Sequence, residues 1–405
     1  MVMRITKITQ YGEQMNYNII NGNNIDILKT FPDNYFDSIV TDPPYGINFL
    51  GKEWDNNVGT LETYTECLRV LKPGGHILAF SAARTYHHLA MVIEEAGFEI
   101  RDQIMWIYGS GFPKSQDVGK NNNMPKYKGW GTQLKPAHEP ICMARKPLEG
   151  SVYKNVQKYG TGAINIDECR VPCEPRTTPV YSDDDKTDNT MFGLNNKIQH
   201  ERVETTTGRF PANVIHDGSD EVTQHFPYST SGARKPEHNI KGLEDGSQRE
   251  IFGSDANSGK YNVQPFEYAE ADEGSAARFF YCPKVNRSER HMGFDNVEPF
   301  NRPKTDTVST GVQVLRKRDP QEFTGNNHPT VKPVELMKYL IKLVTPKNGK
   351  VLDPFNGSGS TGMAAVSLGH EYVGIELDTN YCEISKKRIE AYNDNGFNEL
   401  FEVNK

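Results

Sequence analysis

A glycine-rich segment near the end of the chain has the composition of a ligand-binding loop. Residues 353–362 read DPFNGSGSTG and follow a short apolar run that we predict to be a strand. Glycines between a strand and a helix let a ligand approach the backbone closely, and doubly wound sheets bind ligands at this place. The spacing of Gly357, Gly359 and Gly362 also fits a dinucleotide fingerprint. An NAD-dependent oxidoreductase is therefore one interpretation.

Two acidic residues beside this loop bear on which cofactor it would hold. Glu376 ends the next predicted strand, where a carboxylate can accept hydrogen bonds from ribose hydroxyls. Asp353 ends the strand before the glycines, so its negative charge would lie beside the ligand. A carboxylate suits the cationic sulfonium and the amino group of S-adenosylmethionine better than it suits a pyrophosphate. The flanking residues therefore favour S-adenosylmethionine.

A second chemical motif, Asp42-Pro43-Pro44-Tyr45, directly follows another predicted strand, residues 37–41. Two consecutive prolines fix the backbone and donate no N–H, so the carbonyl groups at this turn are presented as acceptors. Asp42 and the Pro43 carbonyl can accept the hydrogens of an exocyclic base amine, which favours the more tetrahedral nitrogen that attacks a methyl sulfonium. Tyr45 offers an aromatic face for a base taken out of the helix. The tetrapeptide predicts methyl transfer to an amino group.

Both motifs must end strands of one sheet, and the surrounding sequence predicts such a sheet. Apolar runs alternate with segments of helical spacing, which is typical of α/β proteins with a parallel sheet. The predicted strands are 17–21, 37–41, 76–81, 350–353 and 372–376, with an antiparallel pair expected at 99–108 and 138–144. The predicted helices are 62–71, 85–96, 333–344, 360–368 and 379–392. The expected fold class is α/β.

The chain of 405 residues is long for one domain, and its composition divides it into three parts. Residues 1–145 and 327–405 have the α/β pattern and carry one motif each. Residues 146–326 are rich in Gly, Ser, Asn, Asp and Pro and have only short apolar runs. The last part is too short for a domain of its own, so we expect its strands to complete the sheet of the first part, with the middle part inserted between them.

Composition and charge restrict the function classes. The sequence contains no run of about 18 apolar residues, and its first residues lack the apolar stretch of a secretory signal, so we expect an intracellular protein without a membrane span. The formal net charge of −7 argues mildly against nucleic acid as a partner, unless a local positive surface is present. Four lysines of the loop 109–136 are candidates for phosphate contacts, although solvated surface lysines are commoner: Lys114, Lys120, Lys126 and Lys128.

Together the motifs resemble those of amino-directed DNA methyltransferases, which methylate adenine N6 or cytosine N4, in the permuted order where DPPY precedes the FxGxG loop. Residues 71–75 (LKPGG) and 328–333 (HPTVKP) extend the resemblance, the second being similar to a segment that packs near the methionine end of the cofactor. The resemblance implies that Asp42, Pro43, Pro44 and Tyr45 are catalytic. It also implies that S-adenosylmethionine is bound by Asp353, Pro354, Phe355, Gly357, Ser358, Gly359, Thr361, Glu376, Thr330 and Lys332.

The resemblance also carries expectations about fold, partner and target. It implies a Rossmann-like methyltransferase sheet with a largely irregular inserted recognition domain, double-stranded DNA as the partner, and action in the cytoplasm, at the nucleoid or in a host cell if a phage encodes the protein. Asp rather than Ser at position 42 favours adenine N6 over cytosine N4. Relatives commonly carry Gly-Asp where this chain has Gly22-Asn23, so an adenine contact there would come from an amide or move to Asp26.

The cysteines allow two other chemistries. Cytosine carbon-5 methylation needs a cysteine nucleophile, and Pro172-Cys173 occurs, but in the irregular part of the chain and away from any strand end. Cys169, Cys173, Cys282 and His291 are candidate zinc ligands. Because their spacing is loose and only one close pair exists, we expect no metal.

Two tryptophans and one further function class stay open. Trp54 and Trp106 suit either a base pocket or the core. A DNA-binding module without catalysis is the remaining alternative to the enzyme.

Overall fold

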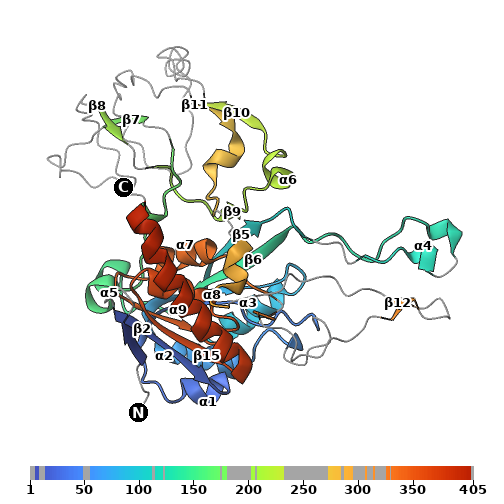
Figure 1. Cartoon of the computed structure of the whole chain (residues 1–405). Helices are drawn as coiled ribbons and strands as arrows, with labels where there is room; N and C mark the ends of the chain where they lie inside the picture. Colours follow the sequence, from blue (N-terminus) through green and yellow to red (C-terminus); the bar gives the residue numbers. More distant parts are fainter. Residues whose placement is uncertain are drawn as a thin grey trace, which may run out of the picture. The chain divides into compact units, whose positions relative to one another are not determined.

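The computed structural model describes residues 5–8, 14–48, 55–111, 115–121, 124–173, 176–179, 202–205, 208–231, 272–283, 287–294, 306–307, 313–314, 325–328 and 330–402. The chain divides into two compact units. Unit 1 comprises Met1–Cys169, Ala212–Val222 and Tyr281–Lys405, and unit 2 comprises Arg170–Pro211 and Thr223–Phe280. Figure 1 shows the helices and strands of both units. Within the described ranges, no helix is long and apolar enough to cross a membrane.

Unit 1 is built on a sheet whose described strands have the order β1-β2-β15-β14-β3-β4-β6-β5-β9. Strands β2, β15, β14, β3 and β4 are parallel, β6 is antiparallel to both β4 and β5, and β9 is parallel to β5. The bounds are β1 Ile5–Ile8, β2 Gln14–Asn21, β3 Phe36–Thr41, β4 Leu71–Phe80, β5 Glu99–Ile107, β6 His138–Arg145, β9 Val214–His216, β14 Lys350–Asp353 and β15 Glu371–Glu376. The predicted α/β class and the antiparallel pair are confirmed.

Helices cover both faces of this sheet. The described helices are α1 Asn24–Leu28, α2 Leu61–Val70, α3 Tyr86–Glu95, α4 Val118–Asn121, α5 Val152–Tyr159, α6 Asp220–Thr223, α7 Val334–Val344, α8 Ser360–Ser367 and α9 Thr379–Glu402. Helices α7, α8 and α9 share one apolar core with the sheet, and α1, α2 and α3 share a second core on the other face. Neighbouring residues of a strand alternate between these cores, as Val351 and Leu352 do, which explains the continuous apolar run of β14.

The two ends of the chain complete a single sheet. Strand β14 pairs with β3, and β15 pairs with β2, both in parallel. The expectation that the last part completes the sheet of the first part is therefore confirmed. The motifs after β3 and β14 stand at adjacent strand ends as a result.

The borders of the compact units differ from the predicted insertion 146–326. Residues up to Cys169 belong to unit 1, because α5 is anchored beside β4 by the buried Asn155, whose Nδ2 donates to the Pro73 carbonyl at 2.9 Å. Strand β9 also belongs to unit 1, since Val214–His216 pairs with β5. Unit 2 is thus shorter than the predicted insertion and is interrupted by a strand of the main sheet.

Unit 2 contains two described pairs of antiparallel strands. Strands β7 (Arg176–Pro179) and β8 (Arg202–Thr205) pair antiparallel, as do β10 (Tyr228–Ser231) and β11 (Asp272–Ser275). Arg278 links the two strands of the second pair, because its guanidinium donates to Ser229 Oγ at 2.9 Å and to the Gly274 carbonyl at 2.6 Å. A further short pair, β12 (Asp306–Thr307) and β13 (Gln313–Val314), lies in the sequence range of unit 1.

The pairing of β4, which follows α2, is irregular near its start. The pairing of β3 with β4 jumps from Phe36–Leu71 to Ser38–His76, so the residues between form a bulge. Gly74 lies in this bulge with φ of +78°. A Cβ atom at Gly74 would come within 2.4 Å of Asn155 Nδ2 and 2.9 Å of Gly162 Cα. Both the backbone angle and the close packing of α5 require glycine here.

We predict that Gly74→Ala lowers the free energy of unfolding by roughly 1–3 kcal/mol, the cost of a strained backbone plus a displaced buried amide. Urea unfolding followed by circular dichroism measures the change. Gly160→Ala is the matched control, because Gly160 has a similar φ of +76° with nothing within 4 Å of its Cβ position. Equal losses in both variants would show that packing against Asn155 contributes nothing.

Candidate functional site

A cavity of about 1660 Å³ opens at the carboxyl ends of the parallel strands of unit 1. Its walls include Gly22 after β2, Asp42 after β3, Asp353 at the end of β14 and Glu376 at the end of β15. Strand β6 runs the opposite way, so its first residues, with Glu139 among them, lie at this same edge. The cavity therefore collects side chains from segments that are far apart in the sequence.

The cavity brings the residues predicted for catalysis and for the cofactor together, with one exception. Its lining includes Asp42, Pro43, Pro44, Tyr45, Thr330, Lys332, Asp353, Pro354, Phe355, Gly357, Ser358, Thr361 and Glu376. Gly359 is not among the lining residues. A Cβ atom there would lie 3.1 Å from Ser385 Cα, so contact between the start of α8 and α9 accounts for that glycine.

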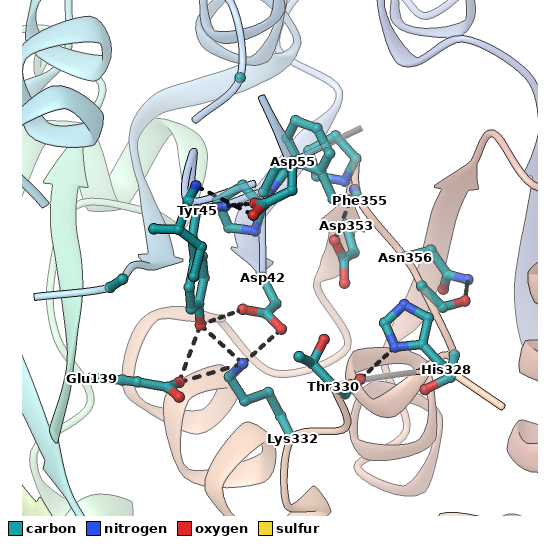
Figure 2. Close-up of a pocket in the computed structure, with 18 of the residues that line it drawn as sticks. Asp42, Tyr45, Asp55, Glu139, His328, Thr330, Lys332, Asp353, Phe355 and Asn356 are labelled. Carbon is teal, nitrogen blue, oxygen red and sulfur yellow. Dashed lines mark hydrogen bonds and ion pairs between the residues drawn. The ribbon is translucent and has the colours of Figure 1, made fainter. Parts of the chain in front are cut away.

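Asp42 and Tyr45 are bound to each other within the tetrapeptide. The Tyr45 hydroxyl donates to Asp42 Oδ1 at 2.8 Å and also lies 3.1 Å from Glu139 Oε2 (Figure 2). Burial, followed by the nearby charges of Asp42 and Glu139, raises the pKa of Tyr45 well above its usual value. The hydroxyl therefore stays protonated and acts as a donor.

Lys332 places a positive charge on the tetrapeptide. Its Nζ lies 2.6 Å from Asp42 Oδ2, 3.0 Å from the Tyr45 hydroxyl and 3.4 Å from Glu139 Oε2. Burial alone would lower the pKa of Lys332, but attraction to Asp42 and Glu139 outweighs it and raises the pKa. The sequence predicted Lys332 beside the cofactor, whereas its ammonium group contacts the motif predicted for catalysis (Figure 2).

Asp55 holds the backbone that follows the tetrapeptide. Its side chain is 1% exposed, and it accepts hydrogen bonds from the backbone N–H groups of Tyr45 at 2.6 Å, Gly46 at 3.1 Å and Ile47 at 3.2 Å. Three consecutive N–H groups on one carboxylate fix the turn after the second proline. Asp55 therefore positions Tyr45 without belonging to the motif.

Asp353 is a buried carboxylate in the cavity wall. Its Oδ1 accepts from Thr41 Oγ1 at 2.6 Å, and its Oδ2 accepts from Thr361 Oγ1 at 2.6 Å. Burial raises the pKa of Asp353 to about 6, although these hydrogen bonds act in the opposite direction. A carboxylate held in this way is prepared to receive a cation.

The glycine loop is held from two sides. The Gly357 N–H donates to Glu376 Oε2 at 2.8 Å. Arg388 of α9, fully buried, donates from Nη1 to the Ser358 carbonyl at 2.5 Å and to Ser358 Oγ at 3.0 Å. Burial raises the pKa of Glu376. One oxygen of the Glu376 carboxylate, Oε2, therefore already binds the backbone of the glycine loop.

The segment 325–333 connects the two motifs. Its His328 ring lies against Gly357, where a Cβ atom would come within 2.9 Å of His328 Nε2. Four residues later, Lys332 binds Asp42. His328 Nδ1 contacts the Thr330 carbonyl, which can only accept, so Nδ1 carries the proton. Burial lowers the pKa of His328 to about 4, so the ring is neutral at pH 7.

The amide that replaces the usual acid after β2 faces the cavity. Asn23 lines it together with Gly22 and Asn24, whereas Asp26 does not. Asn23 Oδ1 accepts from the Ile25 N–H at 2.9 Å and so caps α1. Of the two alternatives for this position, the geometry favours the amide.

Several other candidates lie away from the cavity. Trp106 packs against the apolar core and does not line the cavity, and Trp54 lies outside the described residues. Cys173 is not a lining residue either. Among the described residues, no three His, Cys, Asp or Glu side chains are grouped to hold a metal ion. Three of the four candidate lysines are exposed, Lys120, Lys126 and Lys128, while Lys114 lies outside the described residues.

The sequence reasoning missed Glu139 and Asp55. A signal for Glu139 existed, because the predicted antiparallel strand must begin at the edge where the parallel strands end. Asp55 follows the tetrapeptide by ten residues, and nothing in its neighbours marks it as a backbone anchor. Asp55 lies beside this turn only because of the tertiary fold, which its neighbours in the sequence do not reveal.

We predict that Asp55→Ala accelerates amide hydrogen exchange in the segment 42–48 and lowers the free energy of unfolding by about 1–3 kcal/mol, because backbone donors lose their acceptor. Asp55→Asn keeps one acceptor oxygen and should fall between wild type and the alanine variant. Exchange followed by mass spectrometry measures the first effect, with the β6 peptide as the internal control. Unchanged protection at 42–48 in Asp55→Ala would contradict the assignment.

Comparison with known proteins gives consistent results. The family model for N6 and N4 methyltransferases, described as "DNA methylase", matches residues 36–387. The Type II methyltransferase M2.MboI of Moraxella bovis is 46% identical over 114 residues, 28% of this chain and 41% of that protein, so the match spans less than half of the relative.

A second relative matches over more of its length. The Type II methyltransferase M.HpaI of Haemophilus parainfluenzae is 27% identical over 322 residues, covering 77% of this chain and 76% of that protein. The crystal structure of the M1.HpyAVI–SAM complex aligns with 17% identity and a TM-score of 0.39, over 92% of this chain and 99% of that one. With the family model matching most of its length, the chain belongs to the DNA methylase family of N6 and N4 methyltransferases.

Proposed function

We propose that this protein transfers a methyl group from S-adenosylmethionine to the exocyclic amine of a base flipped out of double-stranded DNA, with adenine N6 as the favoured target. The observation that carries the proposal is the single cavity that joins the Asp42 tetrapeptide to the Asp353 glycine loop. At about 1660 Å³ it exceeds the roughly 300–1,000 Å³ of a usual small-molecule site. The size supports two ligands bound side by side.

The residues on the glycine-loop side fit S-adenosylmethionine. When bound, this molecule supplies an electrophilic methyl group on a cationic sulfonium. Asp353 offers a buried carboxylate for a cationic or amino group. Glu376 has oxygen lone pairs left for ribose hydroxyls beyond the bonds from the Gly357 and Asp378 N–H groups. Phe355 and Pro354 add apolar surface to the same wall. A dinucleotide would place its pyrophosphate near two carboxylates, which disfavours the oxidoreductase alternative.

The residues on the tetrapeptide side fit an amino group. An exocyclic amine has two N–H donors, and Asp42 and the Pro43 carbonyl are acceptors in the cavity wall. Transfer would form the N–C bond as the bond between sulfur and the methyl carbon breaks, with its electron pair staying on the sulfur of S-adenosylhomocysteine. The nitrogen would then carry the positive charge and return to neutrality by releasing one N–H proton. Asp42 would stabilise that positive charge and is a candidate acceptor for the proton. Tyr45 adds an aromatic lining to the place of the base.

Further features support DNA and adenine. Lys120, Lys126 and Lys128 are exposed on the loop between β5 and β6, which is continuous with Gln133 to Glu139 in the cavity wall. These lysines would give a local positive surface to a chain of net charge −7. The tetrapeptide begins with Asp, which favours adenine over cytosine in the resemblance. The inserted unit 2 is the candidate for target recognition, and such an enzyme would act in the cytoplasm.

The proposal is tested with tritiated S-adenosylmethionine and DNA that carries no modification, followed by digestion and nucleoside analysis. We predict label in N6-methyl-2′-deoxyadenosine. We also predict that Asp42→Ala lowers transfer at least roughly 10²–10³-fold, the effect of losing one preorganised electrostatic group, while cofactor binding persists.

Two further variants test the role of the Asp42 charge and of Cys173, and three outcomes would contradict parts of the proposal. Asp42→Asn keeps the shape and one acceptor oxygen without the charge, and Cys173→Ala should keep full activity. Label in N4-methylcytosine would change the base, and label in carbon-5 methylcytosine would contradict the amino-directed chemistry. Binding of DNA without any transfer would instead support the non-catalytic module.

We predict that cofactor affinity decreases as the pH falls below about 6. A bound cation favours the ionised form of Asp353, whose pKa in its absence is about 6. Above that pH the carboxylate is already ionised, and below it binding must displace a proton, so Kd should rise by up to about tenfold per pH unit. Calorimetric titration with S-adenosylmethionine at pH 7.5, 6 and 5 measures this, with proton release detected in buffers of different ionisation enthalpy.

Asp353→Asn separates this carboxylate from Glu376, whose pKa is also raised. The amide variant should bind more weakly at pH 7.5 and lose most of the pH dependence. If Kd of the wild-type protein is the same at pH 5 and 7.5, Asp353 does not bind a cationic group.

A further inference from the structure

The ammonium group of Lys332 lies between two carboxylates from different strands. Its Nζ is 2.6 Å from Asp42 Oδ2, beyond the end of β3, and 3.4 Å from Glu139 Oε2, at the start of β6. The side chain of Lys332 is only 7% exposed, while those of Asp42 and Glu139 are about one fifth exposed to the cavity. One buried cation therefore has two counter-ions available (Figure 2).

In this arrangement both oxygens of Asp42 are already engaged. Oδ2 faces the Lys332 ammonium, and Oδ1 accepts from the Tyr45 hydroxyl. The proposed function needs Asp42 to accept a hydrogen from a base amine and to stabilise a positive charge on its nitrogen. An ammonium group on the same carboxylate opposes both, because it competes for the lone pairs and repels the developing charge.

Glu139 offers a way to release Asp42 without leaving the ammonium unpaired. Only a small displacement separates Lys332 Nζ, at 3.4 Å from Glu139 Oε2, from a close ion pair with Glu139. The ammonium has three N–H donors, and Tyr45 can keep one of them in either arrangement, since its hydroxyl lies within hydrogen-bonding distance of Lys332 and Glu139. Moving a buried cation between counter-ions avoids the large cost of isolating it.

We propose that Glu139 is a positioning residue that takes over the Lys332 ammonium when the target base occupies Asp42. The exchange frees Asp42 Oδ2 for the base amine. The carboxylates of Asp42 and Glu139 and the ammonium of Lys332 together carry one net negative charge near the nitrogen that becomes cationic. This inference rests on the proposed function and adds to it a residue outside the tetrapeptide and the glycine loop.

A purely structural role for Glu139 would look different. Its Oε2 lies 3.1 Å from the Tyr45 hydroxyl, whose one hydrogen can go to Asp42 or to Glu139, and a glutamine side chain keeps an acceptor oxygen for that contact. Glu139→Gln therefore preserves the contact with Tyr45 but removes the charge that would hold Lys332. The variant separates the two roles.

The experiment is a double-mutant cycle on methyl transfer with Glu139→Gln, Lys332→Met and the double variant. In the wild-type background, Glu139→Gln should lower kcat roughly tenfold or more, within the range of coupled neighbours, with the Kd for S-adenosylmethionine unchanged. In the Lys332→Met background, the same substitution should change kcat less than about twofold, because no ammonium remains to be held. Glu139→Asp, which keeps the charge, should recover part of the loss.

Glu149→Gln is the matched control, since Glu149 forms an exposed ion pair with Lys158 outside the cavity and should keep wild-type kcat. If Glu139→Gln lowers kcat equally in both backgrounds, the exchange with Lys332 is overturned. The same holds if the wild-type protein is active and Glu139→Gln keeps its full kcat. A wild-type protein that transfers no methyl group would refute the proposed function, and this inference with it. The Kd for S-adenosylmethionine, measured for each variant, serves as the test that the variant is folded.

Discussion

The ion pair between Lys332 and Asp42 joins the two halves of the site, because its members lie 290 residues apart in the sequence. The tetrapeptide follows β3, whereas Lys332 belongs to the segment that leads into α7. A buried ammonium needs a partner, since removing one member of a buried pair leaves an uncompensated charge. The position of Tyr45 depends on the same pair, because its hydroxyl contacts both members. The geometry of the tetrapeptide is therefore set by a residue from the other end of the chain.

The glycine loop shows a similar dependence on distant elements. Arg388 of α9 holds Ser358, Glu376 of β15 holds Gly357, and His328 lies against the same glycine. Asp353 is kept at the strand end by Thr41 of β3 and Thr361 of α8, despite the cost of burying a carboxylate. Buried polar groups of this kind are retained where they serve binding or chemistry. The conformation of the loop is therefore fixed by contacts with neighbouring elements as well as by its glycines.

The parts of the structure that sequence predicted have local signals. The strands of residues 37–41 and 350–353, and the motifs that follow them, are marked by apolar runs ending in Asp-Pro, and the parallel sheet follows from the alternation of strands and helices. Strand β9 has three residues in a polar region, and its pairing with β5 makes it a strand, so the compact units divide the chain differently from the predicted insertion. Helix α9 continues to Glu402, beyond the predicted end at residue 392.

The candidate site was predictable to the extent that its residues adjoin strand ends. Asp42 and Asp353 satisfy this, and both line the cavity. Lys332 was assigned to the cofactor, but which carboxylate a long side chain reaches is decided by tertiary packing rather than by the residues beside it. Asp55 and Glu139 reach the site because of the direction of β6 and the fold of the chain after the tetrapeptide, and a linear motif does not contain this information. The roles of all these residues in the reaction remain predictions.

The order of strands in the sheet also has a consequence for the newly made chain. Strands β2 and β3 are synthesised early, but the two strands that lie between them, β15 and β14, are among the last. Thr41 and Asp353, which share a hydrogen bond across adjacent strands, are 312 residues apart. At about 5–20 residues per second, a ribosome needs roughly 15 to 60 seconds to add that length. During this time β2 and β3 present unpaired edges, which are templates for aggregation, so this sequence places a demand on chaperones at the ribosome.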